Sequence, residues 1–254
     1  MNFIKTKAIA LRDYKLSDQD KIVTFYTFST GLIKVVAKGA RRIKSRFAPI
    51  AQFPSYSDIL IYRKNPTKMG ILTECSIKSL FPKIREDILR FAYASHLAEI
   101  YLSAIKEEQI NKELFYLMLN TLFLLEKEKY ENLKILLSSS KLKFLRILGY
   151  TPELRKCVNC GKQRDLFQLF YFTPRKGGIL CQDCQIKETQ TIGVPKLTIL
   201  AMDYLLYADL HNSIKPKFHL VEEQISYILD SYLLFHINER KNNSMELIKK
   251  IESQ

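Results

Sequence analysis

The chain of 254 residues contains no tryptophan and only four histidines, which are scattered along it. No run of apolar residues is long enough to span a membrane as a helix. The N-terminus, from Met1 to Ala10, carries two lysines and no apolar run, so we expect no secretory signal there. These absences predict a cytoplasmic protein without a membrane partner.

Residue patterns typical of an active site are also missing. His96 and His236 lie in apolar helical segments, where a histidine is more often a packing residue than a ligand. The pair Gly177–Gly178 lacks the lysine and hydroxyl residues that follow the glycines of a phosphate-binding loop. The acidic pairs Glu107–Glu108 and Glu222–Glu223 are expected on solvated helix faces. We therefore predict that the protein is not an enzyme.

Acidic residues are scarce in the first third of the chain. Residues 1–80 contain fifteen lysines and arginines against five acidic residues, a net charge of +10 out of +14 for the whole chain. Because such a local excess repels itself unless an acidic partner offsets it, we expect this region to bind a polyanion. The alternative is ordinary solubility charge, but solubility does not require such segregation.

The densest positive charge lies in residues 34–46, where six of thirteen residues are cations and none is acidic. Lys34 and Lys38 alternate along a predicted strand and should face one side of its sheet, and Gly39 allows a turn into a loop. Contacts to phosphates carry no sequence information, so binding should be sequence-independent and strongly salt-dependent. The predicted nucleic-acid-binding residues are Lys34, Lys38, Arg41, Arg42, Lys44 and Arg46. The aromatic candidates for stacking on bases are Tyr26, Phe28, Phe47, Tyr56 and Tyr62.

The hydrophobic pattern predicts an α+β fold with more than one domain. Residues 1–80 contain five short segments rich in β-branched and aromatic residues, which favour a closed five-stranded barrel of the OB-fold type. Residues 81–254 predict a mostly helical domain, with helices near 84–105, 112–126, 132–148, 196–210 and 222–237. The first three should form an antiparallel bundle that the last two complete, and the polar residues 241–254 should fray. The expected face of the first helix is Ile84, Ile88, Phe91, Ser95, Ala98, Leu102 and Ile105.

Cysteine is uncommon, but four of the five cysteines form two matched pairs, Cys157 with Cys160 and Cys181 with Cys184. Each pair can hold one side of a tetrahedral ion, and four thiolates leave no position for water or substrate. We predict one structural Zn²⁺ in a module at about 151–190, with one strand at 166–172. Two disulfides or four reduced thiols are the alternatives, and disulfides would need an oxidising compartment. Cys75 is expected as a buried thiol in a strand.

The order of these parts resembles the RecO family of bacterial recombination mediators. The resemblance covers most of the chain and keeps the motifs in the family's order. The residues that carry it are 31–33 leading into 38–42 and Ser45, the helix 93–99, residues 145–154 running into Cys157, and the glycine pair with 181–184.

The resemblance implies an N-terminal OB-fold and a helical domain with an inserted zinc module. It also implies binding of single- and double-stranded DNA, annealing of complementary strands, and help in loading RecA onto DNA coated with single-strand-binding protein. The implied partners are RecR and the acidic C-terminal tail of single-strand-binding protein, in the bacterial nucleoid. The residues alone leave two alternatives open: an RNA-binding or ribosome-associated module, and a pure interaction scaffold.

Overall fold

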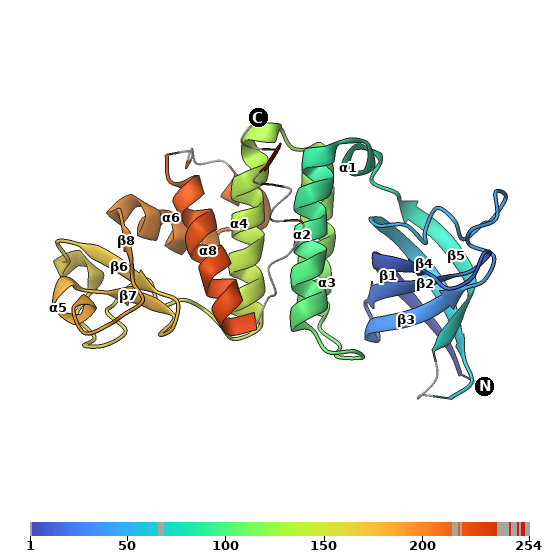
Figure 1. Ribbon diagram of the computed structural model, residues 1–254, viewed down its shortest axis with the longest axis horizontal. Coiled ribbons are helices and arrows are strands. Elements are labelled where there is room, and N and C mark those ends of the chain that lie inside the picture. The colour runs from blue at the N-terminus through green and yellow to red at the C-terminus, as the bar shows by residue number, and fades with distance from the viewer. Residues whose placement is uncertain are drawn as a thin grey trace. The chain divides into compact units, whose positions relative to one another are not determined.

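The computed structural model describes residues 2–65, 69–214, 218, 220–237, 244, 248, 250 and 251. Contacts divide the chain into two compact units. The first comprises Met1–Glu126 and the described part of Asn242–Gln254, and the second comprises Lys127–Lys241. Figure 1 shows the elements of both units. Within the described ranges, no helix combines the length and the apolar character needed to cross a membrane.

The first unit begins with a closed barrel (Figure 1). Its strands follow the order β1-β2-β3-β5-β4, with β4 paired back onto β1. β3 and β5 run parallel, whereas the other neighbouring strands are antiparallel. The predicted five-stranded OB-type barrel is therefore confirmed. The strands are β1 (Asn2–Lys15), β2 (Lys21–Thr27), β3 (Gly31–Ala37), β4 (Ser55–Arg63) and β5 (Gly70–Ser79).

Alternation along the strands fills the barrel with aliphatic side chains. In β4, for example, Ile59 and Ile61 are 2% and 0% exposed, while Leu60 and Tyr62 between and beyond them point outward and are half-buried. Burying one such aliphatic side chain stabilises the fold by roughly 1.5–3 kcal/mol. The segment between β3 and β4 adds four more side chains to this core, which are Ala40, Phe47, Ile50 and Ala51.

Three helices follow the barrel: α1 (Pro82–Glu86), α2 (Ile88–Ala104) and α3 (Lys112–Lys127). The prediction of one continuous helix over 84–105 is wrong, because Asp87 adopts an extended conformation and its carboxylate caps α2 by accepting from the Arg90 amide at 2.9 Å. The expected buried face is also partly wrong, since Ile88 is 63% and Phe91 37% exposed. The break resets the helical phase, so the buried face of α2 contains Tyr93, Leu97 and Tyr101 instead.

α2 and α3 run antiparallel and pack on the barrel within the same unit. The Tyr101 hydroxyl near the end of α2 donates to the Leu114 carbonyl near the start of α3 at 3.0 Å. The ring of Tyr26 in β2 contacts the rings of Tyr101 and Phe115, with centroids 5.5 and 6.1 Å apart. Burial raises the pKa of both tyrosine hydroxyls, which keeps them protonated as donors. The barrel and these two helices therefore meet in an aromatic cluster that is separate from the barrel's own aliphatic core.

Most of the segment 241–254, which was predicted to fray, lies outside the described residues. Ser244 and Ile248 are helical and only 5% and 8% exposed. The Ser244 hydroxyl donates to Glu99 on α2 and lies 3.4 Å from Nδ1 of His96. These two positions are therefore packed rather than solvated.

The second unit contains a helical bundle formed by α4 (Tyr130–Ile147), α6 (Lys196–Tyr207), α7 (Leu210–Ser213) and α8 (Glu222–Ile237). α4 packs against each of the other three helices. The third predicted helix thus packs with the late helices, but it belongs to a different compact unit from α2 and α3. The prediction that the first three helices form one antiparallel bundle is therefore wrong. Figure 1 shows α4 beside α6 and α8.

The remainder of the second unit is a small β-module. Its strands β6 (Phe170–Thr173), β7 (Gly178–Leu180) and β8 (Ile192–Val194) form an antiparallel sheet in the order β7-β6-β8. The predicted strand at 166–172 is wrong in its first half, because Arg164–Leu166 is a 3₁₀ helix and the strand begins at Phe170. The apolar residues 166–170 alone did not reveal that turn.

Candidate nucleic-acid interface and metal site

Residues 38–46, here called the basic arm, leave β3 and run along the outside of the barrel. Ala40 in this arm is buried in the barrel core, whereas the charged side chains of the arm are exposed. In the described part of the chain, no carboxylate forms an ion pair with any of these cations. The five exposed cations of the basic arm are Lys38, Arg41, Arg42, Lys44 and Arg46.

Backbone hydrogen bonds hold the basic arm in a defined shape. Gly39 adopts a left-handed conformation with φ of 65°, as the predicted turn required, and its amide donates to the Asp20 carboxylate at 2.7 Å. The amides of Arg42 and Ser45 donate to carbonyls three residues earlier, each at 3.0 Å. Arg46 donates from its guanidinium to the Thr73 carbonyl of β5 at 2.7 Å. The arm is therefore fixed to the β1–β2 loop at one end and to β5 at the other.

The arginine partners in the arm are neutral, so the positive charge is retained. Arg41 donates to the Ser17 carbonyl at 3.1 Å, and Nε of Arg42 donates to the Gln19 side-chain oxygen at 2.9 Å. These contacts position the guanidinium groups without neutralising them. Among the residues that the structure describes, the amines of Lys38 and Lys44 have no hydrogen-bond or ion-pair partner. The arm thus presents five net positive charges to solvent.

Lys34 lies on the outer face of β3, as the alternation predicted, but its charge is not free. It forms an ion pair with Glu107, in the loop between α2 and α3. The next residue of that loop, Glu108, pairs with Arg63 at 2.6 Å and donates its amide to the Leu32 carbonyl at 2.8 Å. The expectation that Glu107–Glu108 lies on a helix face is wrong, because α2 ends at Ala104 and the pair folds onto β3, but both residues are exposed, as expected.

Only some of the proposed stacking aromatics are accessible. Tyr26 and Phe47 are 0% and 7% exposed and belong to the core, so they cannot stack on a base. Tyr62 is half-buried and packs against Phe3, with ring centroids 5.3 Å apart. Phe3 is 57% exposed and was not recognised in the sequence, although its position opposite Tyr62 follows from the β1–β4 register.

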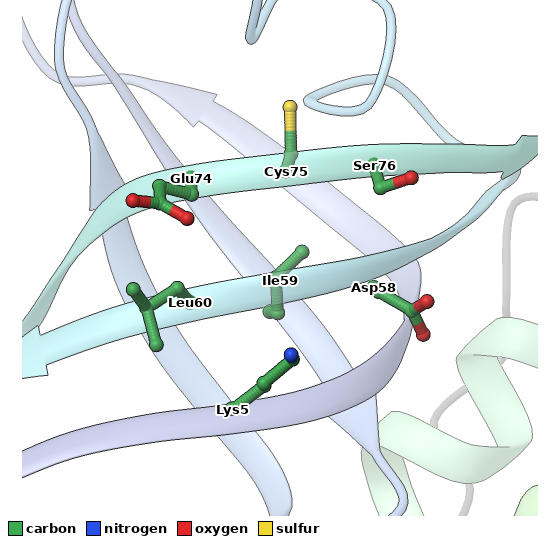
Figure 2. Close-up of a pocket in the computed structure, with 7 residues that line it drawn as sticks. All are labelled: Lys5, Asp58, Ile59, Leu60, Glu74, Cys75 and Ser76. Atoms are coloured by element: carbon green, nitrogen blue, oxygen red, sulfur yellow. The ribbon is translucent and has the colours of Figure 1, made fainter.

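A hollow of about 330 Å³ lies on the outer face of the barrel, across β1, β4 and β5 (Figure 2). The side chains around it include Lys5, Asp58 and Glu74, so its charge is mixed and does not resemble that of the basic arm. Cys75 also borders it and is half-buried rather than buried as expected. Its thiol points away from Lys5 and donates to the Arg46 carbonyl at 3.5 Å. Burial raises the pKa of Cys75, against the opposing effect of the Arg46 charge.

The four paired cysteines meet in the β-module of the second unit. The sulfur atoms of Cys157, Cys160, Cys181 and Cys184 all lie within 4.8 Å of one another. None of the four forms a disulfide bond in the structure, and all four gather in one cluster rather than in two separate pairs. Cys157 and Cys181 are each 2% exposed, and Cys160 is exposed.

Tight turns bring the two pairs together. The amide of Gly161 donates to the Cys157 carbonyl at 2.9 Å, and the Cys184 amide donates to the Cys181 carbonyl at 3.1 Å. Between the pairs, Gly178 allows a close approach of two backbones, because a Cβ there would lie 2.5 Å from the Glu153 carbonyl oxygen. The glycines next to the cysteine motifs are therefore part of the construction of this site.

The sulfur positions fit a tetrahedral metal ion. At a Zn–S distance of about 2.3 Å, the corners of a tetrahedron lie about 3.8 Å apart. The Cys160 and Cys181 sulfurs are 3.7 Å apart. The side-chain amide of Asn159 donates to the Cys184 sulfur at 3.3 Å. Burial disfavours the Cys157 thiolate, but hydrogen bonds from the backbone of Cys160, Cys181 and Asn159 outweigh it and lower its pKa to about 6. These donors stabilise negative charge on the Cys157 sulfur, whereas burial raises the pKa of Cys181 to about 12, so a bound cation would have to stabilise that second thiolate itself.

Two protein-family models match the chain, one in each part. The model described as "Recombination protein O N terminal" matches residues 1–81, and the model described as "Recombination protein O C terminal" matches residues 85–246. The chain belongs to the recombination protein O family. The resemblance predicted from the sequence is therefore confirmed, and the basic arm falls in the family's N-terminal part and the four cysteines in its C-terminal part.

Curated members of this family align over most of the chain. A "DNA repair protein RecO" from Alkaliphilus metalliredigens is 32% identical over 249 residues, covering 98% of this chain and 99% of the relative. One from Bacillus pumilus is 30% identical over 257 residues, covering 98% and 96%. One from Thermodesulfovibrio yellowstonii is 35% identical over 180 residues, covering 70% and 69%.

Proposed function

We propose that this protein is a non-enzymatic mediator of DNA repair by recombination. It binds single- and double-stranded DNA, anneals complementary strands and helps load RecA onto single strands coated with single-strand-binding protein. Its proposed protein partners are RecR and the acidic C-terminal tail of single-strand-binding protein, in the cytoplasm at the nucleoid. Family membership and the names of the relatives support a role in DNA repair.

The single observation that carries the DNA-binding proposal is the exposed charge of the basic arm. Its five cations are held in place by neutral acceptors, and no carboxylate within the described ranges pairs with them. Five phosphate contacts predict a log–log salt slope of about −3.5 for single strands. Neutralising phosphates also lowers the repulsion between two strands, so annealing needs no covalent step. Lys34 is proposed as a sixth contact, which becomes available when Glu107 releases it.

We assign these roles to parts of the chain as follows. Residues 1–80 are the proposed nucleic-acid-binding domain, and residues 81–254 the helical domain with its metal module at about 151–190. We propose that Cys157, Cys160, Cys181 and Cys184 hold one structural Zn²⁺. When bound, the ion supplies a cross-link between two backbone turns and leaves no coordination position for a reactant. Its role is therefore to shape the second unit and not to contact DNA.

Replacing the cations of the basic arm with alanine tests the DNA-binding proposal. We expect the fivefold variant to lose roughly a hundredfold or more in affinity for single-stranded DNA and most of the salt slope. The measurement is fluorescence anisotropy of a labelled oligonucleotide between about 50 and about 200 mM salt. The matched control removes the same charge from exposed lysines elsewhere, namely Lys106, Lys127, Lys129, Lys187 and Lys196. An unchanged affinity in the arm variant, or an equal loss in the control, contradicts the proposed site.

Two further measurements separate a mediator from an RNA-binding module and from a simple basic binder. Competition between DNA and RNA strands of the same sequence should show no preference for RNA. A preference for RNA that rests on the 2′-hydroxyl would instead favour an RNA-binding module. Annealing of complementary strands should persist when they are coated with single-strand-binding protein. A protein that anneals only bare strands would be a basic binder and not a mediator.

A further inference from the structure

Ile43 lies within the basic arm, and its side chain is entirely in solvent. Its exposure of 103% is the highest of any large apolar residue in the described part of the chain, ahead of Leu220 at 91% and Ile186 at 79%. Single exposed apolar residues are common on protein surfaces. Ala40 in this arm and Phe47 directly after it are buried in the barrel core, however, so Ile43 is the large apolar side chain of the arm that is left outside.

The arm holds Ile43 in a defined place. The amide of Arg42 donates to the Gly39 carbonyl and the amide of Ser45 donates to the Arg42 carbonyl, each at 3.0 Å, so Ile43 lies within the second of two consecutive turns. Arg42 is fixed by Gln19, and Arg46 by Thr73 on β5. A β-branched side chain also has few rotamers. Contact of Ile43 with a ligand would therefore cost little conformational entropy, because its backbone and its side chain are already ordered.

The charge around Ile43 limits the ligands that can reach it. Arg42 and Lys44 flank it directly, and no carboxylate pairs with either one among the described residues. A ligand that covers Ile43 must therefore be anionic and also present an apolar surface within a few ångströms of the charge. A nucleic-acid strand has this composition, because base faces lie beside phosphates, and isoleucine is among the side chains that wedge between bases.

We propose that Ile43 is a base-contacting wedge of the basic arm. Arg42 and Lys44 hold successive phosphates of a strand, and the Ile43 side chain lies against a base face and separates that base from its neighbour. The inference rests on the proposed DNA binding and adds to it a contact that the cations cannot make. Unstacking costs least in a single strand, so the wedge favours single strands over duplex DNA.

The test uses the full chain and a single-stranded oligonucleotide containing 2-aminopurine, whose fluorescence rises when it is unstacked. We expect saturating wild-type protein to raise the signal and Ile43→Ala to lose at least about half of the rise, while Ile43→Leu retains it. Affinity should fall roughly three- to tenfold in Ile43→Ala, because a base face covers only part of the side chain and removes only part of its apolar surface from water. The salt slope should stay unchanged because every cation remains. The control Ile88→Ala removes another exposed isoleucine, 63% exposed at the start of α2.

Three outcomes overturn the wedge. In the first, saturating Ile43→Ala raises the 2-aminopurine fluorescence as much as the wild-type protein does. In the second, Ile88→Ala loses as much of that rise as Ile43→Ala. The third is loss of binding to phosphatidylserine vesicles with an unchanged DNA signal, which would assign the exposed Ile43 side chain to a membrane surface. If the wild-type protein binds no single strand in a salt-dependent way, the proposed function falls and the wedge with it. Normal salt-dependent binding without any effect of Ile43 overturns the wedge alone.

Discussion

Lys34 and Glu107 form an ion pair that joins the outer face of β3 to the loop between α2 and α3. The side chains are 48% and 61% exposed, so the pair itself adds only about 0–1 kcal/mol to stability. The pair places a negative charge against Lys34, the cation that precedes the basic arm. If Lys34 is a DNA contact as proposed, the pair should affect binding more than it affects folding.

Removing that negative charge should strengthen DNA binding. We expect Glu107→Gln to raise the affinity for single-stranded DNA by about threefold at low salt, because Lys34 then becomes available to a phosphate. The gain should shrink as salt screens the exposed charges. Lys34→Ala combined with Glu107→Gln should abolish it. Glu86→Gln, at an exposed glutamate of α1, is the control, and an equal gain there would mean that only net charge matters.

Metal content tests the four-cysteine site. The purified protein should contain one equivalent of zinc, and Cys157→Ser should lose it and lower the unfolding temperature, because the metal ties two turns that have little core of their own. Cys75→Ser should keep the metal, since Cys75 lies on β5 in the other unit. Zinc below about half an equivalent in gently purified wild-type protein would count against the site. Binding of single strands by Cys157→Ser should persist, since the basic arm lies in the first unit.

Two glycines of the same module should respond very differently to alanine. At Gly178 a Cβ would lie 2.5 Å from the Glu153 carbonyl oxygen, so the backbones must separate and metal retention should fail. At Gly161 no atom lies within 4 Å of the added Cβ, and the cost is only the left-handed conformation at φ of 74°, about 1 kcal/mol. Thermal unfolding and zinc content of the two variants check this order. A Gly161→Ala variant that is the less stable of the two would contradict it.

Stability of the second unit should depend on pH through Lys143. This buried amine donates to the carbonyls of Leu205 and Ala208, and burial lowers its pKa from 10.5 to about 8. Between these values the unfolded chain binds more protons than the folded chain, so this group makes the unfolding free energy rise from about pH 8 to about pH 10. Denaturant unfolding of wild type and Lys143→Met over that range isolates the contribution. A difference between the two that is constant with pH would show that Lys143 titrates normally.

Local patterns in the sequence predicted most elements, because each rests on neighbouring residues. The helix at 222–237 was predicted with the observed ends, and the five barrel strands follow their alternation. The sulfur cluster followed from cysteine spacing alone. The wrong predictions arise where a single residue, or a contact with a residue far away in the sequence, determines the local structure. Asp87 interrupts a helix by capping the next one, and Glu107 reaches across to Lys34 from a loop. Neither contact leaves a periodic signal.

The shared packing of Tyr26 with Tyr101 and Phe115 has a consequence for how this protein can be divided. The family's N-terminal match stops at residue 81, before either helix that covers this tyrosine begins. A fragment that ends at residue 81 would expose Tyr26 and the surface around it to water, and it would tend to aggregate. Transplanting the barrel into another protein therefore requires taking the chain through about residue 126, the end of the contiguous stretch of the first unit.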